Sequence, residues 1–123
     1  MNVALWIAQV LLAVAFGLAG FTKLSRSRLA LAGQMGWVEN VTDFQLKAIG
    51  GLEVLAVIGL VVAPFVPFAG YLAPLAAVGL VLLMAGAAVT HLRRGELPQV
   101  AGNAVLLAVA LFVAVGRFGP YHF

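Results

Sequence analysis

The chain has 123 residues, of which 64% are hydrophobic and 9% charged, and its mean hydropathy is +1.14. This composition excludes an ordinary soluble domain and indicates a chain built to lie in lipid. The formal net charge of +3 comes from basic residues in short loops beside apolar stretches, which indicates membrane topology signals rather than a nucleic-acid-binding surface.

Four apolar stretches are each long enough to cross a membrane. A helix needs about 20 apolar residues to cross a hydrocarbon core about 30 Å thick. A membrane barrel would instead show strands of about 10 residues with alternating polarity, whereas these stretches are continuously apolar. The sequence therefore predicts an all-α fold, a polytopic membrane four-helix bundle that forms one domain over residues 1–123. We expect helices at approximately 3–24, 43–63, 71–92 and 98–117.

Residues 28–41, after the first helix, are too polar and too short to span a membrane. Leu29, Leu31 and Met35 nevertheless give this segment an apolar side, so we predict that it lies in the membrane interface. Trp37 is interpreted as an anchor at the level of the lipid headgroups, and part of a lid over a cavity is the alternative.

The second helix has a clear start and a clear end. Thr42 is followed three residues later by Gln45, which is the spacing of a capping box. Pro64 cannot continue the helix, so we expect it to end in the turn that follows residue 63. Pro74 and Pro98 fit the first turns of the third and fourth helices, where a proline is tolerated.

Basic residues are unevenly divided between the two ends of the predicted bundle. Six of the seven lie in or beside the loops that follow the first and third helices, and only Arg117 lies at the other end. By the positive-inside rule, those loops are cytoplasmic and both termini face the outside. The six are Lys23, Arg26, Arg28, Lys47, Arg93 and Arg94.

Two weaker patterns concern how the helices pack. Residues 19–26 (AGFTKLSR) match residues 87–94 (AAVTHLRR) at four of eight positions, so an open alternative is that the bundle consists of two tandem helical-hairpin repeats. Several glycines are interpreted as packing residues that allow close helix approach. They are Gly17, Gly20, Gly59, Gly79 and Gly86.

Four polar side chains are predicted at the cytoplasmic ends of the helices: Lys23, Glu53, His91 and Asn103. Glu53 lies six residues after Lys47, so at 1.5 Å per residue it sits about 9 Å below the membrane surface. An isolated carboxylate is costly at that depth, and we expect Glu53 to face the interior of the bundle.

This polar cluster has two interpretations, between which the sequence does not decide. In the first, the side chains are interhelical hydrogen-bonding partners, each bond contributing about 0.6 kcal/mol. In the second, they form a ligand- or proton-binding site in which Glu53 is the candidate catalytic residue and Lys23, His91 and Asn103 contact the ligand. For Gln9 and Asn103 the structural interpretation is preferred.

Several kinds of chemistry are excluded. With no cysteine, the chain has no disulfide, thiol redox pair or cysteine-ligated metal of its own. A haem held by two histidines would need His91 and His122, which are predicted at opposite faces of the bilayer. One His with one Glu is short of the three ligands of a catalytic zinc, so we predict no metal site and no covalently bound cofactor within the chain.

Four motifs occur in order along the chain: AGFTKL (19–24), KAIGGLEVLAVIGL (47–60), GLVLLMAGAAVTHLRRGE (79–96) and NAVLLA (103–108). They resemble those of the DoxX-like family of small bacterial integral membrane proteins, and the likeness covers essentially the whole chain. The resemblance implies a four-helix bundle in the bacterial cytoplasmic (inner) membrane, with Lys23, Glu53 and His91 where such proteins carry their polar signature. Members of the family have been linked to a thiosulfate:quinone oxidoreductase, to membrane oxidoreductase complexes that handle reactive oxygen or thiol stress and, in animals, to receptor assembly.

The residues and the resemblance together suggest one main function and two alternatives. We expect a subunit of a membrane oxidoreductase system that binds a quinone or a similar apolar ligand near Lys23, Glu53 and His91. The alternatives are a non-catalytic membrane assembly or scaffold protein and a proton-transfer enzyme acting on a lipid-like substrate, so whether the protein is an enzyme stays open. The expected partners are membrane lipid and membrane or membrane-associated proteins, with a homo-oligomer as a further option and no nucleic acid.

Overall fold

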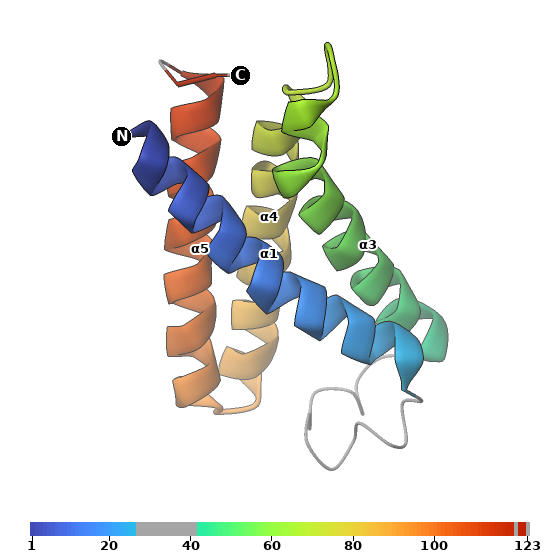
Figure 1. Ribbon diagram of the computed structural model, residues 1–123. Helices are drawn as coiled ribbons and strands as arrows, with labels where there is room; N and C mark the ends of the chain where they lie inside the picture. The colour runs from blue at the N-terminus through green and yellow to red at the C-terminus, as the bar shows by residue number, and fades with distance from the viewer. Residues whose placement is uncertain (27–41, 120, 123) are drawn as a thin grey trace.

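The computed structural model describes residues 1–26, 42–119 and 121–122. Within these ranges the chain is helical and contains no strand, which confirms the predicted all-α membrane four-helix bundle (Figure 1). Each of the four long helices is long and apolar enough to span a membrane. The predicted interfacial segment 28–41, with Trp37, lies outside the described residues. The elements are α1 (Asn2–Ser25), α3 (Asp43–Val61), the 3₁₀ turn η2 (Ala63–Phe65), α4 (Leu72–Arg93) and α5 (Leu97–Phe118).

Local signals explain where α3 begins and ends. The predicted capping box is present: the Thr42 hydroxyl accepts from the backbone N–H of Gln45 at 3.1 Å, and the Gln45 side chain accepts from the Thr42 N–H at 3.0 Å. α3 ends at Val61, two residues before the expected end. The reason is Pro64, which has no N–H to donate and disfavours a helical conformation of the residue before it, so the chain tightens into η2.

The helices form two neighbouring pairs. Figure 1 shows α4 and α5 side by side, α1 lying across the bundle against α3, and both chain termini at the same end. α1 packs mainly on α3 and α4 mainly on α5, while α3 packs on α4 and α1 on α5 less extensively. We call the end with Met1 and Phe118 the termini end, and the end with Lys23, Lys47 and Arg93 the basic end.

All four helices contribute to an apolar core at the middle of the bundle. Leu12 of α1, Leu60 of α3, Leu80 of α4 and Val113 of α5 are fully buried in it. The outward surface is apolar too, as expected where lipid replaces water around a bundle. Exposed side chains on the four helices include Leu11, Leu18, Leu55, Leu82, Leu92, Val105 and Val115.

Two glycines bring α1 and α3 into close contact near the basic end. A Cβ on Gly20 would lie 2.8 Å from the carbonyl oxygen of Gly50 and 3.1 Å from the Cβ of Glu53. A Cβ on Gly50 would lie 2.9 Å from the Cβ of Lys23. The contact therefore needs residues without side chains, as predicted for Gly20, and it holds Lys23 and Glu53 against each other.

We expect Gly20→Ala to lower the free energy of unfolding by about 1–3 kcal/mol, the usual penalty for overpacking. The added methyl group would meet backbone of α3, which cannot move aside as a flexible side chain can. Gly51→Ala is the matched control, because nothing lies within 4 Å of its Cβ. Unfolding in mixed detergent micelles, followed by circular dichroism, measures both, and equal stability of the two variants would contradict the close α1–α3 contact.

Candidate functional site

An ion pair joins α1 to α3 inside the bundle. Lys23 Nζ donates to Glu53 Oε1 at 2.6 Å, and only 8% of Lys23 and 2% of Glu53 are exposed. Glu53 therefore faces the interior, as predicted from its depth. A buried carboxylate with a bonded ammonium is far less costly than an isolated one, so each charge makes the other tolerable.

Lys47 has a structural role that its interpretation as a topology signal did not include. Its Nζ donates to the backbone carbonyls of Lys23, Leu24 and Arg26 at 2.8, 3.0 and 2.6 Å. These carbonyls lie at the C-terminal end of α1, where a cation is favourable because the last carbonyls lack helical partners. Lys47 thus ties the end of α1 to the first turns of α3 and helps to position Lys23.

A cavity of about 350 Å³ lies beside the ion pair, toward the basic end of the bundle. Lys23, Glu53, His91 and Asn103 all line it, so α1, α3, α4 and α5 each contribute one of the four predicted site residues. The structure thus brings the predicted residues together, and their role in binding stays a prediction. The remaining lining residues are Ile49, Leu82, Leu83, Met84, Gly86, Ala87 and Thr90.

Two glycines of α4 differ from their predicted role. A Cβ on Gly79 or Gly86 would meet nothing within 4 Å, so the interpretation of both as close-packing residues is wrong. Gly86 lines the polar cavity, and Gly79 lines an apolar groove between α3 and α4. The interpretation is right for Gly59, whose Cβ would lie 2.9 Å from the Cβ of Ala76. In this bundle some glycines therefore allow close helix contact, and others leave space that a cavity or groove occupies.

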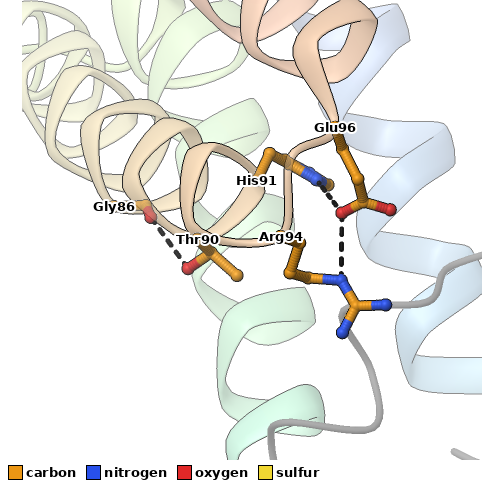
Figure 2. Close-up of polar contacts among 5 residues, drawn as sticks. All are labelled: Gly86, Thr90, His91, Arg94 and Glu96. Carbon is orange, nitrogen blue, oxygen red and sulfur yellow. Dashed lines mark hydrogen bonds and ion pairs between the residues drawn. The ribbon is translucent and has the colours of Figure 1, made fainter.

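His91 is held at the cavity by the loop between α4 and α5. Figure 2 shows His91 and Arg94 converging on the carboxylate of Glu96, with His91 Nδ1 at 2.9 Å and Arg94 Nε at 3.0 Å from Oε1. A carboxylate only accepts hydrogen bonds, so Nδ1 carries the proton and Nε2 is the ring nitrogen that this hydrogen bond does not use. Glu96 was not among the predicted site residues, although its negative charge two positions after Arg94 was the available signal.

The hydrogen bond from His91, together with the positive charge of Arg94, lowers the pKa of Glu96 below its ordinary value of 4.5. A carboxyl group whose pKa is depressed on folding stabilises the folded state above its unfolded pKa, and this contribution is lost as the pH falls through the folded pKa. We therefore expect Glu96→Gln to show a shallower loss of stability than wild type below about pH 4.5. Unfolding midpoints measured on an acid pH series test this. An equally steep loss of stability with falling pH in both proteins would contradict it.

Asn103 presents an unsatisfied donor beside the cavity. Its Nδ2 is buried and has no hydrogen-bond partner among the described residues. An amide donor left in this state costs about 1–3 kcal/mol, so such groups in native proteins call for an explanation. Since Asn103 lines the cavity, a hydrogen-bond acceptor placed there would satisfy it.

A second polar cluster lies near the termini end. Arg117, only 2% exposed, donates from Nε to Gln9 Oε1 at 2.6 Å, and from Nη1 to Asn2 Oδ1 at 2.6 Å and to the Tyr121 carbonyl at 2.8 Å. Its guanidinium also lies over the Trp6 ring, 5.6 Å from the ring centroid. From the sequence, Arg117 was expected only as a topology signal, because nothing in its neighbourhood along the chain indicates burial.

Gln9 extends this cluster to a third helix. Its Nε2 donates to the backbone carbonyl of Leu60 at 2.7 Å, so Gln9 joins α1 to both α3 and α5. These two hydrogen bonds are the interhelical contacts that a structural role of Gln9 requires. Across the described ranges 1–26, 42–119 and 121–122, no group of three His, Asp or Glu side chains is placed to hold a metal ion.

A comparison with known families identifies the chain. The model of the DoxX-like family matches residues 7–113, which is most of the chain. The protein therefore belongs to the DoxX-like family, as its motifs suggested. No match was found among curated proteins or among solved structures.

Proposed function

We propose that this DoxX-like membrane protein is a subunit of a membrane oxidoreductase system and binds a quinone or a similar apolar ligand in the bundle. The observation that carries the proposal is the cavity of about 350 Å³ lined by Lys23, Glu53, His91 and Asn103. Small-molecule sites are typically mostly apolar, with a few convergent polar groups and a volume of about 300–1,000 Å³. This cavity meets that description, because its four polar residues lie among apolar ones that include Leu82, Leu83 and Met84.

The polar groups around the cavity suit a head that carries carbonyl or hydroxyl oxygens. Asn103 Nδ2 is a buried donor without an acceptor among the described residues. His91 Nε2 is not used in the hydrogen bond between Nδ1 and Glu96, so it is available to bond an oxygen of the ligand. Glu53 is the group that would take up or release a proton at the head, with Lys23 stabilising its anion. A quinone changes the number of its protons when it is reduced, so a site with such a carboxylate suits that chemistry.

The proposal includes a position in the bacterial cytoplasmic (inner) membrane with both termini outside. Among the residues that the structure describes, five of the six Lys and Arg residues lie at or beside the basic end, and the positive-inside rule assigns that end to the cytoplasm. Both chain termini lie together at the other end (Figure 1). The cavity would then sit in the cytoplasmic half of the bilayer. Fusion of a reporter such as alkaline phosphatase to the C-terminus tests this orientation.

Mass spectrometry of organic extracts from gently purified protein tests the ligand. We expect wild type to carry a quinone or another isoprenoid, and Glu53→Gln and Gly86→Leu to lose at least about nine-tenths of it, a tenfold loss of affinity or more. Glu53→Gln removes the charge at the head, whereas Gly86→Leu adds an apolar side chain to the wall of the cavity and changes neither member of the ion pair. Nothing lies within 4 Å of a Cβ on Gly86, so the added side chain has room there.

Gly51→Leu is the matched control, because Gly51 is also helical, a Cβ there meets nothing within 4 Å, and Gly51 does not line this cavity. It should keep the ligand. If wild type and all three folded variants carry only bulk phospholipid, the ligand proposal fails. The polar cluster is then structural, and an assembly role for the protein becomes the better hypothesis.

A further inference from the structure

A second hollow runs along the lipid-facing side of α3 and α4. It has a volume of about 670 Å³, and every residue that lines it is Leu, Ile, Ala or Gly. Small buried residues such as Ala56 and Gly59 contribute its floor, while Leu55 and Leu82 are 65% and 68% exposed and form its rims. In a membrane, lipid would border this apolar groove at its exposed leucines.

The apolar groove adjoins the polar cavity. Leu82 and Leu83 line both of them. Gly79 lies in the groove and Gly86 in the cavity, one turn on either side of Leu83 on the same face of α4. Because a Cβ on either glycine would meet nothing within 4 Å, α4 leaves open space on both sides of the shared leucines.

We propose that the apolar groove holds the hydrocarbon tail of the amphiphile whose polar head occupies the cavity. The inference rests on the proposed function and specifies its ligand: a polar head joined to a flexible apolar tail that leaves the bundle between α3 and α4. Lipid is as apolar as the groove, so the tail gains little by entering it. The groove acts instead as the route by which a tail fixed to a bound head reaches the bilayer.

This route predicts a specific effect of filling the groove. A side chain at Gly79 would stand in the path of the tail without entering the polar cavity, which Gly79 does not line. A ligand with a tail would then lose affinity, and a ligand with the same head and no tail would not. A side chain at Gly86 would instead obstruct the head itself and weaken both ligands.

Equilibrium binding of two benzoquinone probes with the same head, one with a decyl tail and one with no tail, tests the inference. The full chain in nanodiscs is compared as wild type, Gly79→Leu, Gly86→Leu and Gly51→Leu, with Gly79→Ile as a second plug of different shape. Each comparison uses one probe on two proteins, so partitioning of the probe into the bilayer cancels. We expect Gly79→Leu to lower the affinity for the tailed probe by about tenfold or more, because the added side chain overpacks the contact with the tail. The affinity for the tail-free probe should stay within about twofold of the wild-type value.

The outcomes separate the two proposals. If both folded Gly79 variants bind the tailed probe as well as Gly51→Leu does, while Gly86→Leu weakens both probes, the tail route is overturned and the head site stands. If Gly79→Leu changes only the oligomeric state, the groove is an interface between copies and the tail route is again overturned. If wild type binds neither probe, or Gly86→Leu binds both normally, the proposed head site fails and the tail route fails with it.

Discussion

Replacing Lys23 alone with Met is expected to lower the free energy of unfolding by about 3–5 kcal/mol, the usual cost of removing one partner of a buried ion pair. The change leaves the Glu53 carboxylate, 2% exposed, without the ammonium that lies 2.6 Å from it. Lys47 cannot take its place, because its Nζ is bonded to three carbonyls at the end of α1.

The double variant Lys23→Met/Glu53→Leu is the control for that prediction. Replacing both members of a buried ion pair by apolar side chains is often neutral or stabilising, so we expect its stability to lie within about 1 kcal/mol of wild type. Unfolding in mixed micelles of the wild type, both single variants and the double variant completes the cycle. If the double variant were as unstable as Lys23→Met, the loss would come from packing rather than from the unpaired charge.

The double variant also separates stability from binding. A folded protein without the ion pair would keep the bundle but lack two polar groups of the cavity. Retention of the ligand by this variant would show that the Lys23–Glu53 pair serves the fold alone. Loss of the ligand from a stable double variant would assign the pair to the site.

Replacing Arg117 with Ala is expected to destabilise the bundle by about 3 kcal/mol. Arg117 is the donor for the Gln9 and Asn2 side chains and for the Tyr121 carbonyl, so its removal takes a hydrogen bond from each. It also removes the contact with the Trp6 ring at the same end of the bundle. Because these groups belong to α1 and to the end of the chain, the α1–α5 contact near the termini should loosen first.

Arg93→Ala is the matched control for Arg117→Ala. Arg93 is exposed at the end of α4, and substitutions of this kind usually change stability by less than about 0.5 kcal/mol. Micelle unfolding measures both variants, and limited proteolysis reports whether the N-terminal turns of α1 open. Equal stability of the Arg117 and Arg93 variants would mean that the termini-end cluster does not hold α1 to α5.

The features that depend on neighbours along the chain could be predicted from the sequence. Four apolar stretches of sufficient length require four membrane helices, because lipid satisfies no backbone hydrogen bonds. Thr42 and Gln45 set the start of α3, since a capping box is a local interaction. The depth of Glu53 along its helix was enough to place it in the interior, because an isolated carboxylate is too costly in lipid.

Which polar groups meet, and where space remains between the helices, depends on contacts between residues far apart in the sequence. Arg117 and Gln9 are 108 positions apart and Lys23 and Glu53 are 30 apart, so no local spacing predicts these bonds. Glycine serves a tight helix contact at position 20, whereas the glycine at position 86 borders open space. In a soluble protein the apolar stripe of a helix shows which side is buried, but here the core face and the lipid face are both apolar. The rotation and crossing of each helix, and with them the cavity and the groove, therefore follow from packing among all four helices.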